Sequence, residues 1–129
     1  MVSLIDLPKT ILSAAGYDTV PLGLQGRPLS ETEDPDWEEA VYIQISESFV
    51  GRALRTNRYK YVVHAPDCDP WKESGSTVYK EKYLFDLASD PLETVNLVND
   101  RDYEEIRRGL KERLIRFGEE AGESFAVEG

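Results

Sequence analysis

Hydrophobic residues recur with a helical period at both ends of the chain and alternate with polar residues in its centre. Near the start, Leu4, Leu7 and Ile11 lie on one face of a helix predicted over residues 3–15, with Ser3 or Asp6 as its cap. Near the end, three- and four-residue spacing predicts an amphipathic helix capped by Asp100 or Asp102. Its apolar positions are Tyr103, Ile106, Leu110, Leu114 and Phe117. The tail beyond Gly122 is expected to fray.

Between these helices the pattern changes to the two-residue alternation of strands, in residues 40–46, 49–55, 59–64 and 83–87. The turns between the first three are too short for a parallel crossover, so they predict antiparallel hairpins. Residues 17–39 and 65 to about 80 read as loops. The fold class is therefore α+β, with about four antiparallel strands and the C-terminal helix packed on one face of the sheet. We expect residues 1–39, the N-terminal helix and long loop, to form one part and residues 40–129 the other.

Composition limits the functions open to the chain. Its 129 residues suffice for one modest core, and 40% hydrophobic with 31% charged residues indicates a globular domain. The net charge of -10 argues against nucleic acid and against an anionic membrane surface as partners. No apolar run approaches a membrane span, and Asp6 stands where a signal peptide is basic. The sequence leaves the localisation open.

Few side chains are candidates for chemistry. Cys68 is the only cysteine, so no internal disulfide forms, and two flanking acids make it a poor nucleophile. The only histidine, His64, is either a strand-end residue or part of a loop, with Trp71 and Lys72, that faces a substrate. The acids of residues 31–39 form either a calcium site or, as we expect, a solvated linker.

A fixed acidic turn follows the fourth predicted strand. Asp90-Pro91 ends the strand, because proline removes a donor and a carboxylate accepts nearby amide protons, and Asn96 can do the same one turn later. Arginines 52, 55 and 58 either clamp a sulfate or pair with acids. We favour ion pairs to acids near this turn, namely Asp86, Asp90 and Glu93.

Four segments, in order, resemble sulfatases of the alkaline phosphatase superfamily. Residues 83–97 are similar to the family's "LYDLxxDPxExxNL" signature, and residues 51–61 to its "RAxRTxxYKY" hairpin. Residues 2–16 resemble "VSxxDLxPTxLxxAG" with Lys9 inserted, and residues 26–29 resemble "GRSL" with Pro28 in place of serine. The ordered set is more specific than any one motif and covers the C-terminal region of a sulfatase only.

The resemblance implies a chemistry whose nucleophile motif this sequence lacks. Sulfatases use formylglycine from a "CxPSR"-type motif together with calcium, and no such motif occurs here. We therefore expect no catalytic residue, metal ligand or cofactor in this chain, which would be the C-terminal region of a sulfuric ester hydrolase. Its expected partners are a catalytic N-terminal domain or chain and, when isolated, further copies of itself.

Two other functions stay open: a stand-alone acidic interaction module, or a subunit that completes a separate catalytic chain. The sequence assigns no substrate. The residues expected to form the structural motif are Arg52, Arg55, Asp86, Asp90, Pro91, Glu93 and Asn96.

Overall fold

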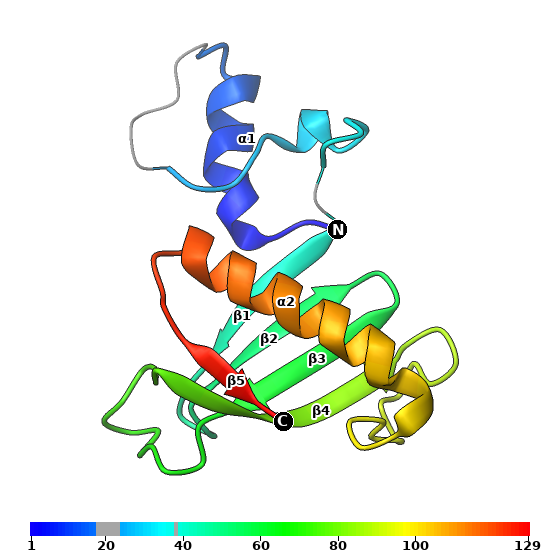
Figure 1. Ribbon diagram of the computed structural model, residues 1–129. Coiled ribbons are helices and arrows are strands. Elements are labelled where there is room, and N and C mark those ends of the chain that lie inside the picture. The colour runs from blue at the N-terminus through cyan, green and yellow to red at the C-terminus, as the bar shows by residue number, and fades with distance from the viewer. Residues whose placement is uncertain (18–23, 38) are drawn as a thin grey trace. The chain divides into compact units, whose positions relative to one another are not determined.

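The computed structural model describes residues 1–17, 24–37 and 39–129, and the chain forms two compact units, Met1–Val41 and Tyr42–Gly129 (Figure 1). Each unit is described by itself. No helix among the described residues is long and apolar enough to cross a membrane.

The first unit contains α1 (Leu7–Ala14), preceded by a 3-10 turn (Leu4–Asp6) and followed by another at Leu29–Glu31. The predicted N-terminal helix therefore exists, but its first turn has 3-10 geometry. Pro8 lies in the first turn of α1, where its missing N–H leaves no helical carbonyl unpaired. Gly16 ends the helix at φ 80°, a conformation that costs glycine little. Part of the predicted loop, residues 18–23 and 38, lies outside the described residues.

The second unit is built on one sheet with the strand order β1-β2-β3-β4-β5. The strands are β1 (Ala40–Ile45), β2 (Gly51–Thr56), β3 (Tyr59–His64), β4 (Val78–Asp86) and β5 (Ala126–Glu128). The β2–β3 pair is antiparallel, as its short turn predicts, and the β3–β4 pair is also antiparallel, across the longer loop of residues 65–77. The prediction of an α+β fold with a mainly antiparallel sheet is confirmed.

Three details of the prediction are wrong. The sheet has a fifth strand, because β5 pairs in parallel with β4 through Val78↔Ala126 and Tyr79↔Val127. Part of the tail that was expected to fray, Ala126–Glu128, is therefore a strand of the sheet. β4 begins inside the predicted loop, at Val78, and β2 begins two residues later than predicted.

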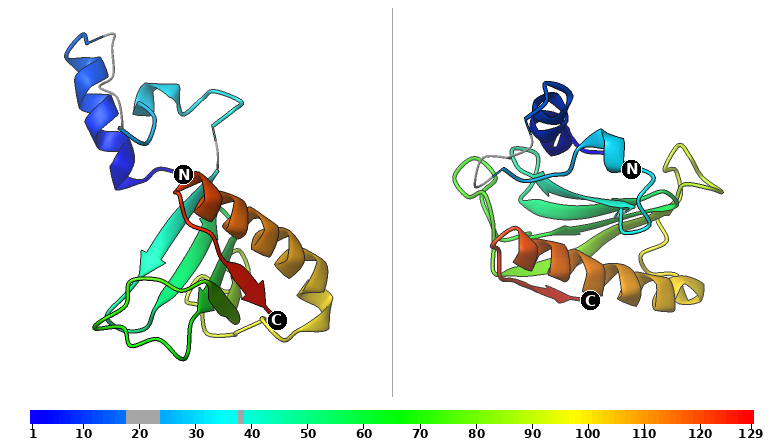
Figure 2. Two further views of the ribbon diagram at one scale, coloured as in Figure 1. Left: turned by 60° about the vertical axis from the view of Figure 1, so that its left-hand side comes forward. Right: turned by 90° about the horizontal axis from the view of Figure 1, so that it is seen from above.

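α2 (Glu104–Glu120) covers one face of the sheet, as both views of Figure 2 show. A 3-10 turn (Arg101–Tyr103) precedes it, and the Asp100 carboxylate caps this turn by accepting from the Asp102 amide at 3.0 Å. α2 buries Leu110, Leu114 and Gly118. Burial of a leucine side chain stabilises a fold by about 2 kcal/mol, so this face, with the buried Leu54, Tyr61 and Leu84 of the strands, accounts for much of the core.

Candidate functional site

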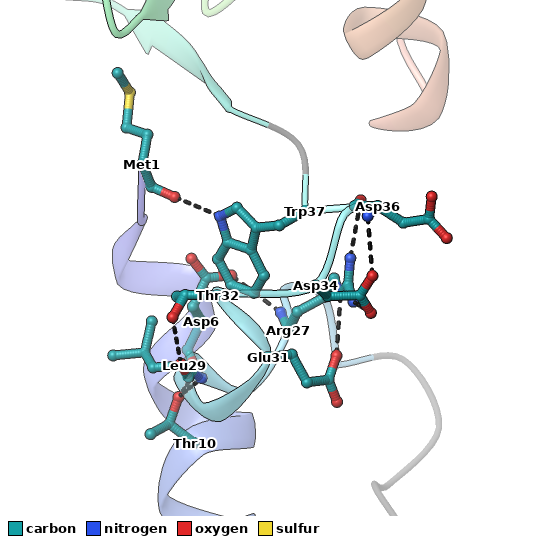
Figure 3. Close-up of polar contacts among 10 residues, drawn as sticks. All are labelled: Met1, Asp6, Thr10, Arg27, Leu29, Glu31, Thr32, Asp34, Asp36 and Trp37. Atoms are coloured by element: carbon teal, nitrogen blue, oxygen red, sulfur yellow. Dashed lines mark hydrogen bonds and ion pairs between the residues drawn. The ribbon is translucent and has the colours of Figure 1, made fainter.

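The segments that resemble sulfatases gather into polar networks, one in each unit. In the first unit the network starts at Asp6, a buried carboxylate (Figure 3). Its two oxygens accept from the amides of Ser3 at 2.7 Å and Arg27 at 3.0 Å. The Thr10 hydroxyl donates to the Asp6 carbonyl at 2.7 Å and accepts from the Leu29 amide at 3.0 Å. Two segments about twenty residues apart in sequence are thereby fastened together.

Gly26 is required at this junction. A Cβ atom there would lie 2.3 Å from the Ile5 carbonyl oxygen, and φ is 78°. Both the close approach and the left-handed backbone exclude a larger residue. The motif-like segments 2–16 and 26–29 are therefore explained by one shared contact between their backbones.

The Arg27 side chain binds several groups of the acidic segment, residues 31–36 (Figure 3). It donates to Glu31 at 3.0 Å, to Asp34 at 2.8 Å and to the Asp36 carbonyl at 3.0 Å. Its guanidinium lies 5.2 Å from the ring centroid of Trp37, whose indole N–H donates to the Met1 carbonyl at 2.7 Å. The backbone amide of Asp36, and then Arg27, lower the pKa of Asp34.

This network bears on the two interpretations of residues 31–39, of which residue 38 lies outside the described residues. Among the described residues, no three acidic, histidine or cysteine side chains are placed to share a metal ion. The described residues therefore do not fit the calcium that the family implies. Glu31 and Asp34 are exposed, as expected for a solvated segment, and both pair with Arg27.

In the second unit the acidic turn after β4 is held by charge pairs. Asp86 is buried, and its oxygens accept from Arg58 Nε at 3.0 Å and Nη2 at 2.8 Å, the two-point geometry that arginine offers a carboxylate. This pair lowers the pKa of Asp86. Glu93 has a positive φ of 56° and accepts from Lys60 Nζ at 2.6 Å, with Arg55 Nη1 4.0 Å away.

Asp90 and Asn96 close the same turn through the backbone. Asp90 accepts from the Val95 amide at 2.8 Å and from the Thr94 hydroxyl at 3.0 Å, and the Val95 bond is the main cause of its lowered pKa. Pro91 is exposed at the tip of the turn. Asn96 accepts from the Leu84 amide at 3.0 Å and donates to the Lys82 carbonyl at 3.0 Å. It thereby satisfies backbone groups of β4 beyond the end of β5.

Arg52 does not pair with this turn, so the expectation for this arginine is wrong. It is buried in β2, and its Nε donates to Glu123, after α2, at 2.8 Å. The alternation of β2 explains the difference, since Arg52 and Arg55 lie on opposite faces of the sheet. The hydroxyl of Tyr42 is also buried, and burial is the main cause of its raised pKa.

The three candidates for a substrate-facing loop are dispersed. His64 ends β3, with its ring edge-on to Phe49 at 6.3 Å, and burial, then Lys82 and Lys80, lower its pKa. Trp71 is 78% exposed, and Lys72 pairs with Asp69 at 3.0 Å. Among the described residues, no hydrogen bond, ion pair or ring contact joins His64 to Trp71 or Lys72. Cys68 lines a separate pocket of about 220 Å³ with Lys80 and Glu128.

The sequence analysis missed a further acid in β4, Glu81, whose side chain is only 8% exposed. Its carboxylate accepts from the Tyr61 hydroxyl at 2.8 Å and pairs with Arg107 at 3.1 Å and Lys111 at 3.3 Å. Arg107 also donates to the Val98 carbonyl. The signal that was available is the four-residue spacing of Arg107 and Lys111, which places both on the flank of the buried face of α2.

The sheet, its covering helix and the four motif-like segments define a sulfatase-type C-terminal domain. The chain belongs to the family described as "N-sulphoglucosamine sulphohydrolase, C-terminal", which matches residues 1–120. No curated protein sequence matches it.

Solved structures share this fold. One was determined in complex with its substrate D-glucosamine-2-N,6-O-disulfate (23% identity, TM-score 0.73, 91% of this chain and 24% of that one). Another is a putative sulfatase from Bacteroides thetaiotaomicron (24%, 0.72, 92% and 25%). A third is the phosphonate monoester hydrolase of Agrobacterium radiobacter (23%, 0.65, 89% and 24%). The chain thus spans about a quarter of the length of these proteins.

Proposed function

We propose that this chain serves as the non-catalytic C-terminal domain of a sulfatase-like hydrolase. The sulfate ester would be hydrolysed by a catalytic domain or chain that supplies the formylglycine nucleophile and the calcium. The observation that carries this proposal is the family match over residues 1–120 to a C-terminal region, in a chain about a quarter as long as its structural neighbours.

The internal networks support a structural role for the motif-like segments. The Asp6 carboxylate binds the Arg27 amide, the Thr10 hydroxyl binds the Asp6 carbonyl, and the Arg58 side chain binds Asp86. Side chains committed to such bonds hold backbone segments in place and are not free to bind a sulfate group. The chain would therefore contribute surfaces to an active site and not the reacting groups.

The first surface is the apolar face of the N-terminal helical segment. Leu4 is 81% exposed and Ile11 66%, with Val2, Ile5 and Leu7 also exposed. An apolar face of this kind in a water-soluble domain marks a protein contact. The proposed occupant is the catalytic sulfatase domain, whether it belongs to the same polypeptide or to a separate one.

A binding experiment tests this surface. The chain should co-purify with a separately produced sulfatase catalytic domain, and the double variant Leu4→Glu, Ile11→Glu should abolish the complex. Leu92→Glu is the matched control, because Leu92 is 83% exposed but lies in the acidic turn. Equal binding by the double variant and the control would contradict the proposed surface.

The second surface is the loop of residues 65–77, called here the Trp71 loop, which we propose meets the substrate. An exposed indole offers a flat apolar face, and the neighbouring Lys72 supplies positive charge for an anionic ester. In the complete enzyme, Trp71→Ala should raise KM for the sulfate ester and leave kcat nearly unchanged. An unchanged KM would contradict the proposal that this loop binds the substrate.

A further inference from the structure

The Trp71 loop shares its supports with the segment that follows α2. We call residues 122–128 the C-terminal strap; it turns back at the end of α2 and runs beside β4 as β5 (Figure 1). Two side chains that belong to neither segment, Arg52 of β2 and Tyr79 of β4, contact both of them. The strap and the loop are therefore not independent parts of the surface.

Arg52 forms the first connection. Its Nε donates to the Glu123 carboxylate of the strap at 2.8 Å, and its Nη2 donates to the Ser74 carbonyl of the loop at 3.1 Å. Its Nη1 donates to the Gly51 carbonyl at 2.8 Å. Gly75 adjoins the same group, because a Cβ atom there would lie 3.0 Å from Arg52 Nη2. One buried guanidinium thus fixes the backbone of the loop from beneath.

Tyr79 forms the second connection. Its hydroxyl accepts from the Ser76 amide of the loop at 2.9 Å. Its ring meets the Phe125 ring of the strap edge-on, with centroids 5.1 Å apart, and the Arg52 guanidinium lies 5.5 Å from its centroid. Phe125 in turn fills the space above Gly118 of α2, where a Cβ atom would lie 2.4 Å from the ring. The C-terminal end of α2 therefore supports the Tyr79–Phe125 ring pair.

The charges in this cluster make the position of the loop depend on the strap. Glu123 is the acidic partner of Arg52, whose guanidinium also donates to the backbone carbonyls of Gly51 and Ser74. A buried guanidinium that loses its counter-charge is driven to leave the interior for water. Its departure would break the bond to Ser74, although within the described part of the chain Glu123 itself forms no hydrogen bond or ion pair with the loop.

We propose that Arg52 is a positioning residue through which the C-terminal strap holds the Trp71 loop in place. Arg52 and Glu123 would then tune substrate recognition from a distance, a consequence that rests on the proposed function. The structural coupling itself does not depend on what Trp71 binds.

Amide hydrogen exchange of the complete chain, followed by NMR, tests the coupling. Glu123→Gln keeps the shape of the side chain and removes its charge. The amides of Lys72, Glu73 and Ser76 should then exchange about tenfold faster, since a charge-assisted bond is lost. Glu120→Gln is the matched control, because Glu120 lies on the surface at the end of α2, three residues before Glu123, and pairs with Arg116 at 3.7 Å. Arg52→Lys, which keeps the charge but not the fork of donors, should also loosen the loop.

The outcomes separate the alternatives. Faster exchange confined to the loop and strap in Glu123→Gln, with the control like wild type, supports the coupling. Faster exchange in the strap alone overturns it, and so does an equal rise throughout residues 42–129. In the complete enzyme, Glu123→Gln should raise KM and not kcat. Loosening of the loop without a change in KM would retain the coupling and reject the proposed role of the Trp71 loop in substrate binding.

Discussion

Two arginines organise this chain, and they do so in different surroundings. The side chain of Arg27 is 36% exposed and binds partners four to nine residues away in sequence. The side chain of Arg52 is 4% exposed and joins Ser74 to Glu123, 22 and 71 residues away. Exposed ion pairs contribute little and are screened by salt, whereas breaking a buried pair leaves an uncompensated charge. The first arginine shapes a local loop, and the second joins distant parts of the fold.

The largest effect is expected at Arg52. Arg52→Met should lower the free energy of unfolding of residues 42–129 by about 3 kcal/mol, because it strands Glu123 and the Ser74 carbonyl. Urea unfolding followed by the circular dichroism of the sheet measures this. The free energy of unfolding of Arg52→Lys should lie between those of Arg52→Met and wild type. If the free energy of unfolding fell by less than about 1 kcal/mol, which is typical of an exposed ion pair, Arg52 would not differ from Arg27 as proposed.

The next largest loss of stability is expected where Phe125 of the strap packs on Gly118 of α2. Gly118→Ala should destabilise the second unit by about 1–3 kcal/mol, because its Cβ atom would overlap the Phe125 ring. Gly109→Ala, on the same helix, meets nothing within 4 Å and should stabilise the helix by up to about 1 kcal/mol. Thermal melts of both variants compare them directly. Equal shifts would mean that Phe125 does not pack on α2 in solution.

A smaller effect should appear in acid. Asp86 and Asp90 have pKa values below the ordinary 3.8 in the folded chain, Asp86 through Arg58 and Asp90 through the Val95 amide. As the pH falls below 3.8 the unfolded chain takes up protons first, so the stability that these groups provide is lost there and is complete above it. Asp90→Ala and Asp86→Asn should each flatten this loss. Asp67→Ala, in the exposed part of the Trp71 loop, should leave the profile unchanged; a steep loss in all three variants would contradict the assignment.

The smallest effect is expected at Arg27. Arg27→Met should speed amide exchange at Asp36 and Trp37, because the guanidinium holds the Asp36 carbonyl and lies against the indole ring. At about 1 M salt, where screening acts within about 3 Å, the difference from wild type should shrink. The effect of Arg52→Met should persist in the same salt. Equal salt sensitivity of the two arginines would remove the distinction between them.

Self-association offers a separate test of the N-terminal apolar face. At micromolar concentration the isolated chain should form a dimer or a higher oligomer through residues 4–11 or an edge strand, despite its net charge of -10. Sedimentation velocity measures the species, and Leu4→Glu with Ile11→Glu should shift the chain toward monomer. A strictly monomeric wild-type chain would indicate an autonomous module.

The sequence predicted what depends on local pattern. Leu110 and Leu114 repeat at helical spacing, and the two residues between Thr56 and Tyr59 suffice only for a hairpin, so α2 and the β2–β3 pair were predictable. β5 was not, because three residues carry too little periodicity and their pairing depends on where α2 ends. The start of β4 was missed because Lys80 and Lys82 alternate with Tyr79 and Glu81 without an apolar stripe.

The same limit applies to the candidate site. The proximity of Asp86 to Arg58 follows from the strand register, in which Tyr59 pairs with Asp86. The pairing of Arg52 with Glu123 depends on the return of the strap across the sheet, and no spacing in the sequence encodes it. His64 and Trp71 were grouped because they are near in sequence, yet no hydrogen bond or ring contact joins them among the described residues.

An assay of the purified chain tests the central claim, that this domain serves a sulfatase without carrying out its chemistry. The chain should show no hydrolysis of aryl sulfates or phosphate monoesters, with or without added calcium, and addition of a sulfatase catalytic domain should be required for turnover. Metal-dependent hydrolysis by the chain alone, abolished by Cys68→Ala, would contradict the account.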